Sequence, residues 1–436
     1  MGILPKANEG RPGRSVLANA GWLYLDQGFR AVFSLVAFSV VARHLGPEQY
    51  GVLSFATAFP ALFLPVAALG LDYVVVQELV RRPGDTSKIL GTAALMLTAG
   101  TVAALGLAMA GLAWLDGGHP ARPLIWWTIG SLLGQPFQIV DYFFQSRIAS
   151  RYTVLARSAA NVAGNGWRLA LVATGAELQW FAAAVLVEAA VLSIGLKAAY
   201  RASGGEVIRP WREADRGEAM RLWRAAWPLM AGGVAMALYL RFDQLLLEHI
   251  AGPAVLGVYA AGVRLGDVTQ FVTYALIMSY FPRFVAAHGA GPAVFAAARD
   301  RFFARITWLA VAVAAGVTVV APWITGGLLG GRFENSAGVL VLMAWANVFA
   351  AQIGVRGKWF LLEGWQLRSL GFFAVGAVSH LAGVWLLAPR FGAMGAAVSF
   401  CVAQALMALV APLMSAKTRL AAVTAWRSFL PAQLRI

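Results

Sequence analysis

The chain has 436 residues, of which 60% are hydrophobic and 13% are charged, and its mean hydropathy is +0.69. Soluble domains carry about 25% charged residues, so this composition excludes a soluble protein and predicts an all-α, polytopic membrane protein. The net charge of +15 is expected to reflect basic loops on one side of a membrane, and no nucleic-acid partner is expected. The single cysteine, Cys401, excludes a disulfide framework or a thiolate metal site, and we expect neither metal nor cofactor.

The first apolar helix covers residues 21–42 and carries two charges at bilayer depth, Asp26 and Arg30. The helix is long enough to cross the hydrocarbon core. The two residues are four apart, so they share one face and can pair. A charge at this depth costs roughly 2.5–3.5 kcal/mol on insertion scales, which makes both residues functional candidates.

A turn that follows this helix recurs about 206 residues later. The two copies are His44-Leu45-Gly46-Pro47 with Gly51-Val52, and His249-Ile250-Ala251-Gly252-Pro253 with Gly257-Val258. Intramembrane charges flank the second copy, with Arg241 and Asp243 before it and Arg264 and Asp267 after it. The repeat predicts two similar halves, and transporters commonly bind their cargo where such halves meet. The alternative is that Gly-Pro is merely a common connector between helices.

Hydropathy predicts twelve spans, at about 16–42, 50–76, 89–115, 123–146, 152–175, 178–200, 224–248, 254–281, 303–325, 336–357, 367–388 and 392–415. Of the 35 Lys and Arg residues, 26 fall in the termini, in the even-numbered loops or at span edges beside those loops, four in the odd-numbered loops and five in the span interiors. The asymmetry predicts that both termini are cytoplasmic and that the protein is a multi-pass protein of the cell inner membrane. The first span lacks a small-residue cleavage site and is predicted to be retained.

The predicted organisation is two six-helix lobes around a central cavity. Residues 1–200 form the N-terminal lobe, 201–223 a cytoplasmic linker, 224–415 the C-terminal lobe and 416–436 an amphipathic cytoplasmic tail.

The fifth span has the sharpest polar pattern, because its polar residues are spaced by four, four and three and share one face. They are Arg157, Asn161, Asn165 and Arg168. No acid lies between the two arginines on this helix, so we expect them to bind an anionic ligand, since Arg offers bidentate geometry to phosphate.

Other spans carry further polar residues. The fourth contains Gln135, Gln138, Asp141 and Gln145 on one predicted face, and the eighth contains Arg264, Asp267 and Gln270. The interior acids are Asp26, Asp141, Glu188, Asp243 and Asp267, which balance the five interior arginines. Two interpretations remain: interhelical ion pairs that fix a bundle, or a polar cavity in which Gln138 and Gln270 accompany the arginines as ligands.

Several motifs resemble the polysaccharide-repeat flippases of the Wzx type, within the multidrug/oligosaccharidyl-lipid/polysaccharide exporter superfamily. These are Asn19 at the start of span one, ARHLGPEQYG at the first outer turn, Leu69-Gly70 towards the end of span two, and FGAMGAAVSF at 391–400. The resemblance implies alternating access, an undecaprenyl-diphosphate-linked oligosaccharide as cargo, and cationic ligands in the first helices of each lobe, which Arg30, Arg241 and Arg264 match. It also implies membrane lipids and a downstream polysaccharide polymerase as partners.

This cargo carries a diphosphate and a large polar head, so unaided crossing of hydrocarbon is costly. The chain has no GxxxxGK[ST] nucleotide motif. Energy would therefore come from cargo consumption or from H⁺ or Na⁺ bound at Asp26, Asp141, Asp243 or Asp267.

Three alternatives remain. A multidrug/cation antiporter of the same superfamily would have a cavity dominated by acids. A lipid II flippase tends to have two extra spans. A membrane glycosyltransferase or polymerase needs catalytic carboxylates or histidines in a sizeable outer loop, and the scattered acids here have no such spacing. We therefore expect a protein that is not an enzyme.

Overall fold

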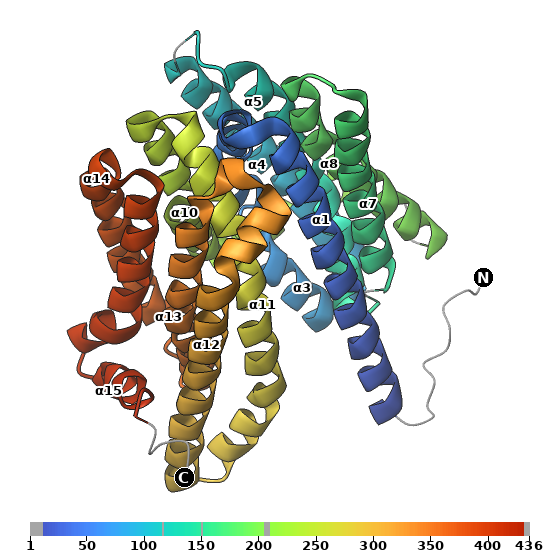
Figure 1. Cartoon of the computed structure of the whole chain (residues 1–436). Coiled ribbons are helices and arrows are strands. Elements are labelled where there is room, and N and C mark those ends of the chain that lie inside the picture. The colour runs from blue at the N-terminus through green and yellow to red at the C-terminus, as the bar shows by residue number, and fades with distance from the viewer. Residues whose placement is uncertain (1–11, 116, 150, 205–209, 431–436) are drawn as a thin grey trace. The chain divides into compact units, whose positions relative to one another are not determined.

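The computed structural model describes residues 12–115, 117–149, 151–204 and 210–430, and these contain helices and turns but no strand (Figure 1). The first part of the chain forms α1 (Pro12–Ala61), α2 (Leu64–Ala68), α3 (Leu71–Arg81), η1 (Pro83–Asp85), α4 (Thr86–Trp114), α5 (Arg122–Ile129), η2 (Gly130–Phe137), α6 (Gln138–Ser146), α7 (Arg151–Thr174) and α8 (Leu178–Ala202). The second part forms α9 (Pro210–Glu213), α10 (Arg216–Ala251), α11 (Pro253–Gly289), α12 (Pro292–Leu329), η3 (Gly331–Phe333), α13 (Ser336–Leu362), α14 (Gln366–Ala405), η4 (Leu406–Val410), η5 (Ala411–Met414) and α15 (Arg419–Arg427). The all-α prediction is confirmed.

Internal contacts divide the chain into two compact units. Unit 1 contains Met1–His44 and Ala56–Ala237, and unit 2 contains Leu45–Phe55 and Leu238–Ile436. These units differ from the predicted lobes in two segments, because the first outer turn groups with unit 2 and the first half of α10 groups with unit 1.

Seven helical segments in the described part of the chain are long and apolar enough to cross a membrane. Two of them, Arg30–Arg81 and Gly371–Met414, each overlap two of the predicted spans. α1 and α14 each consist of two helices that are joined at one glycine with non-helical backbone angles. The glycine is Gly46 in α1 and Gly392 in α14. The multi-pass character is confirmed, and the count of twelve stays a prediction.

The fourth predicted span is not one helix. It consists of α5, the 3₁₀ segment η2 and α6, with Pro136 inside η2. Proline lacks the backbone donor that an α-helix needs, and a 3₁₀ segment turns the chain by a different angle per residue. The predicted single polar face is therefore interrupted, and Gln138 begins a new helix, α6, that also carries Asp141 and Gln145.

The repeated turn has the same conformation in both copies. Gly46 and Gly252 adopt positive φ angles of 74° and 84°, a region that glycine enters without steric cost. Within unit 2 the copies contact each other reciprocally: a Cβ on Gly51 would lie 1.8 Å from the Pro253 carbonyl oxygen, and a Cβ on Gly257 would lie 1.8 Å from that of Pro47. The repeat is thus a packing device and more than a common connector.

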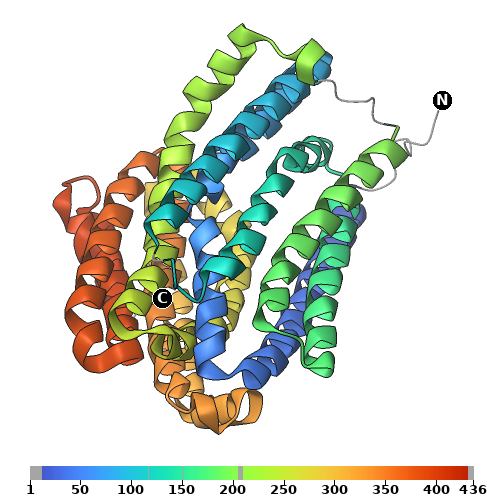
Figure 2. The same cartoon turned by 90° about the horizontal axis from the view of Figure 1, so that it is seen from above.

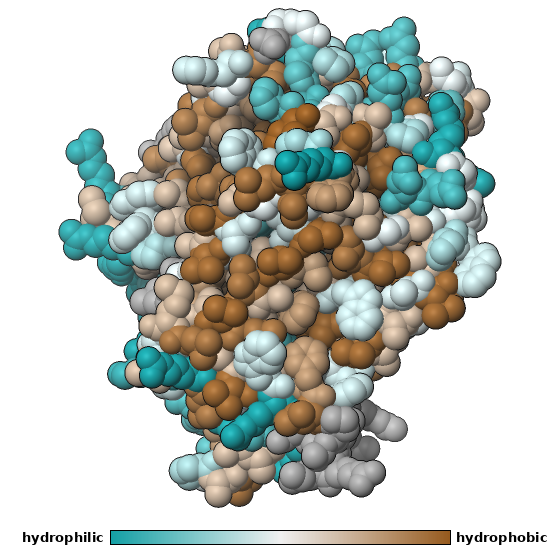
Figure 3. All heavy atoms as spheres, turned by 60° about the vertical axis from the view of Figure 1, so that its left-hand side comes forward, coloured by the Kyte–Doolittle hydropathy of each residue, from teal (hydrophilic) through white to brown (hydrophobic). Residues whose placement is uncertain are grey.

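Each unit has its own apolar core. In unit 1, α3, α4 and α6 bury Leu71, Ile89 and Phe144, and α7 and α8 pack side by side (Figure 2). In unit 2 the core is aromatic and includes Phe302 and Phe360. Hydrophobic side chains also cover the middle of the face shown in Figure 3, as expected for helices that contact lipid.

A charged cluster outside the apolar segments links α3 to α10 in unit 1. Arg82 Nη2 lies 2.5 Å from Glu218 Oε1 and 2.6 Å from Glu78 Oε2, and the Glu218 side chain is fully buried. The hydrogen bond to Glu218 raises the pKa of Arg82 above its usual value. Asp215 precedes α10 and accepts the backbone N–H of Glu218 at 2.7 Å. That bond holds the pKa of Asp215 below its usual value.

Candidate functional site

The polar stripe of the fifth predicted span lies on α7 and faces α1 in unit 1. Asn161 and Asn165 both donate through Nδ2 to Ser34 Oγ of α1, at 2.9 and 3.2 Å. Asn165 also accepts a hydrogen bond from Arg168 Nη1 at 3.1 Å. Three of the four stripe residues are therefore linked by hydrogen bonds, and a serine that sequence reasoning did not single out connects them to α1.

Arg157, at one end of the stripe, pairs with an acid from a neighbouring helix. Its Nη2 lies 2.7 Å from Asp141 Oδ2 of α6, and Gln145 donates to the same oxygen at 2.9 Å. The side chain of Arg157 is 43% exposed, whereas that of Asp141 is 4% exposed. The acid is buried and accepts two hydrogen bonds, while a large part of the arginine side chain remains accessible.

Arg168, at the other end, lies near Glu188 of α8. Its Nη2 is 3.7 Å from Glu188 Oε2, a distance that allows attraction without a good hydrogen bond. Both arginines thus have acid partners on adjacent helices, which the absence of acids on α7 itself did not reveal. Glu188, whose role was open, is such a partner.

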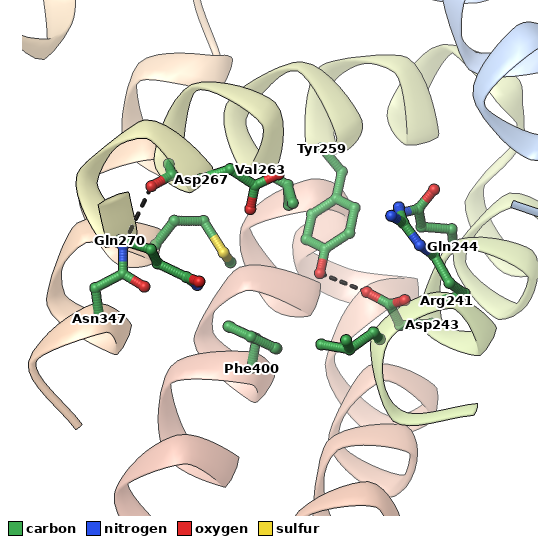
Figure 4. A pocket seen from close by; sticks show the side chains of 12 residues that line it. Arg241, Asp243, Gln244, Tyr259, Val263, Asp267, Gln270, Asn347 and Phe400 are labelled. Atoms are coloured by element: carbon green, nitrogen blue, oxygen red, sulfur yellow. Dashed lines mark hydrogen bonds between the residues drawn. The ribbon is translucent and has the colours of Figure 1, made fainter. Parts of the chain in front are cut away.

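Unit 2 contains a second polar site, a cavity of about 150 Å³ between α10, α11, α13 and α14 (Figure 4). Its lining residues are Leu240, Arg241, Asp243, Gln244, Tyr259, Val263, Gly266, Asp267, Gln270, Met343, Asn347 and Phe400. Four of the predicted site residues, Arg241, Asp243, Asp267 and Gln270, therefore come together in one cavity, although they come from two helices.

The side chains of Arg241 and Asp243 leave α10 in different directions, as expected for residues two positions apart on a helix. Arg241 is exposed, whereas Asp243 is buried and accepts a hydrogen bond of 2.6 Å from the Tyr259 hydroxyl. Arg264 of α11 is also exposed but is not among the cavity-lining residues. Within the described ranges, neither Arg241 nor Arg264 forms an ion pair.

The remaining predicted residues lie in unit 1. Gln138 is half-buried at the start of α6, and Arg30 is half-buried on α1. The side chain of Asp26 lies outside the described residues. All assigned ligand and ion-coupling roles remain predictions.

Two buried polar residues were missed. His380 of α14 is fully buried and lies near Asp243. An ionisable residue inside an apolar span is a functional candidate by its position alone, so the sequence could have indicated it.

Arg356 of α13 was counted with the inner loops because it stands at the edge of a predicted span. It is 3% exposed, and its Nη1 donates to the Met407 carbonyl oxygen at 2.6 Å. That carbonyl belongs to a π-helical segment, Leu406–Val410, in which backbone hydrogen bonds span one more residue than in an α-helix. The sequence has no local pattern that predicts such a segment.

Comparison with known proteins decides the family. The polysaccharide biosynthesis protein family matches residues 16–288. The chain belongs to this family. A Shigella dysenteriae protein named as an O-antigen transporter is 23% identical over 187 residues, which is 43% of this chain and 46% of that protein. The match thus spans about half the length of this curated relative.

Two solved structures share the fold of this family member almost throughout. A lipid II flippase MurJ in an inward closed conformation matches with a TM-score of 0.74 and 10% identity, over 93% of this chain and 90% of that one. An inward-facing multidrug resistance MATE transporter matches with a TM-score of 0.70 and 15% identity, over 92% and 96%. The chain therefore shares its fold with these two proteins. These relatives are described as transporters and a flippase.

Proposed function

We propose that this protein moves an undecaprenyl-diphosphate-linked oligosaccharide from the cytoplasmic to the periplasmic leaflet by alternating access, for surface polysaccharide synthesis. The observation that carries the proposal is the α7 stripe, in which two arginines flank two asparagines on one helix face. Asn161, Asn165 and Arg168 are joined by hydrogen bonds through Ser34 of α1 and through each other, and Arg157 pairs with Asp141 of α6. Membership of the polysaccharide biosynthesis family supports it.

The chemistry of the stripe suits a diphosphate beside a sugar. Arginine presents five donors in a planar fork, and the structure gives Arg157 one acid partner, to which it donates through Nη2. Its other donors can reach a phosphate oxygen while Asp141 holds the side chain in place. Asparagine side chains can both donate to and accept from sugar hydroxyls.

The experiment compares a double variant of this pair with a control variant in proteoliposomes that contain a short undecaprenyl-diphosphate oligosaccharide. Arg157→Gln/Asp141→Asn removes both charges while keeping donors and acceptors, so the fold should survive. We expect transport to fall at least about tenfold, because a charge-assisted hydrogen bond contributes about 1.5–3 kcal/mol. Arg427→Gln, at an exposed arginine of α15, is the matched control. Full transport by the neutral pair would refute a ligand role for Arg157.

The cation antiporter alternative is tested on the same preparation. A ligand that binds the native state raises its melting temperature. A short polyprenyl diphosphate should stabilise the protein, and tetraphenylphosphonium, an organic cation, should not. The reverse result would favour the antiporter.

A further inference from the structure

A cluster of arginines lies at one end of unit 2, and the proposed cargo site does not use it. Arg283 of α11 and Arg305 of α12 both lie against the ring of Tyr280, with their guanidinium carbons 5.9 and 5.6 Å from its centroid. Arg305 also donates a hydrogen bond to the Tyr280 hydroxyl. Arg301 stands one turn before Arg305 on α12. Within the described ranges, none of these three arginines forms an ion pair.

The protein itself leaves the charge of this cluster unbalanced. Residues four apart on a helix are neighbours, and like charges at that spacing repel each other. Arg301 and Arg305 are such a pair, and a third arginine is held at the same tyrosine as Arg305. Asp300, the acid nearest in the sequence, is paired with Arg299 at 2.8 Å. An anion relieves this repulsion, and the guanidinium donors match the oxygens of a phosphate.

One face of α11 presents the chemistry that contacts a phospholipid, in the order of its parts. Val272, Leu276, Tyr280 and Arg283 are spaced by four, four and three, so they share that face. Val272 and Leu276 are 42% and 41% exposed and lie inside the predicted span 254–281, whereas Arg283 lies just beyond its end. The face therefore offers apolar contacts to an acyl chain, an aromatic ring of the kind enriched at the membrane–water boundary, and a cation for the headgroup.

The neighbouring helix α15 indicates that the arginines lie at the level of lipid headgroups. Thr307, two residues after Arg305, has its Oγ1 3.0 Å from the Oγ of Ser428, which directly follows α15. The exposed residues of α15 combine apolar side chains with cations and are Leu420, Val423, Trp426, Arg419 and Arg427. Such a combination is typical of helices at the membrane–water boundary. α15 and the paired ends of α11 and α12 lie at the same end of unit 2 (Figure 1).

We infer that Arg283, Arg301 and Arg305, together with Tyr280, form a binding site for the phosphate of an anionic phospholipid whose acyl chain lies along α11. Basic sites between transmembrane helices on the cytoplasmic side bind such headgroups, and the charge distribution predicts this end of unit 2 to be cytoplasmic. A zwitterionic lipid would place its ammonium group beside the arginines, where no acid receives it. The site is independent of the proposed cargo.

The first test measures lipid selectivity on the wild-type protein. Native mass spectrometry of the full chain in neutral detergent gives the dissociation constant of the first bound lipid. We expect phosphatidylglycerol to bind at least about tenfold more tightly than phosphatidylcholine with the same acyl chains. Inorganic phosphate, which lacks a chain, should not displace phosphatidylglycerol at equal concentration. Equal binding of the two lipids, or displacement by inorganic phosphate, would overturn the lipid site.

The second test locates the site with variants. Arg283→Gln/Arg305→Gln should weaken phosphatidylglycerol binding at least about tenfold. Tyr280→Phe keeps the ring and every charge but loses the hydroxyl that holds Arg305, so it should weaken binding about threefold. Lys197→Gln/Arg201→Gln is the matched control, because it removes two exposed bases one turn apart on α8 and should bind as the wild type does. A control that loses as much affinity as the site variant would show non-specific attraction and overturn the site.

Folding and cargo are separated by two further measurements. The melting temperature without added lipid reports whether each variant is folded, and if the double arginine variant is not, Tyr280→Phe and the wild-type selectivity still decide. Undecaprenyl diphosphate without a sugar is the last probe. Its tighter binding than phosphatidylglycerol, lost in the same variants, would assign the cluster to the cargo and overturn the phospholipid site. A wild type that moves no lipid-linked oligosaccharide refutes the proposed function alone.

Discussion

The contact between the two repeated turns makes a sharp prediction about one methyl group. Gly51→Ala would place a Cβ 1.8 Å from the Pro253 carbonyl oxygen, and that distance would have to grow to at least 3.0 Å. The obstacle is backbone in a helical turn, so no side chain can rotate away. Overpacking of this kind costs about 1–3 kcal/mol, although alanine recovers up to about 1 kcal/mol of helix propensity. We expect a net destabilisation of about 2 kcal/mol.

The assay is the free energy of unfolding in mixed micelles, with Gly106→Ala as the matched control. Gly106 lies in α4, and a methyl group added there would have no neighbouring atom within 4 Å, so the same substitution at this position should be neutral or stabilising. The variant Gly51→Ala/Gly257→Ala extends the test. Once the first methyl separates the turns, the second costs little, so the double variant should be less destabilised than the sum of the two single ones. If Gly51→Ala behaves like Gly106→Ala, the reciprocal contact does not exist in solution.

Three further predictions concern unit 1, and each is checked by unfolding of the purified variant. Glu218→Ala should destabilise by about 2 kcal/mol, since it removes the buried partner of Arg82, which retains Glu78. Asp215→Ala should lower the melting temperature at pH 7, because the folded state lowers the pKa of this carboxyl and so favours its charged form. The difference in melting temperature between wild type and variant should shrink as the pH falls below about 4, and it should vanish below the folded-state pKa. Ser34→Ala should cost roughly 1–2 kcal/mol, because two α7 asparagines lose their shared acceptor.

Local patterns were sufficient for the features that repeat at helical spacing. The i, i+4 series on α7 predicted one polar face, and the structure has it. The recurrence of His-x-(x)-Gly-Pro identified two turns that share one conformation in the structure, because glycine before proline can adopt only a few conformations. The same method failed at Pro136, where the period changes from α to 3₁₀ within one predicted span.

Partners across helices were beyond the sequence. Whether Arg157 meets Asp141, or Arg168 meets Glu188, depends on how α6, α7 and α8 pack, and spacing along one helix carries no information about that. His380 and Asp243 are 137 positions apart in the chain. Each was visible as an intramembrane ionisable residue, but only the structure brings them within 3.4 Å.

The pair of Arg157 and Asp141 shows why an ion pair and a ligand site are not exclusive alternatives. The two partners differ in burial: the acid is 4% exposed and the base is 43% exposed. Removing Asp141 would leave a guanidinium that water can reach, whereas removing Arg157 would leave a buried carboxylate with Gln145 as its remaining donor. An unpaired buried charge is far more costly than an exposed one. Loss of the arginine alone should therefore reduce stability as well as transport, and only the neutral pair of substitutions separates the anchoring of this side chain from its action on a phosphate.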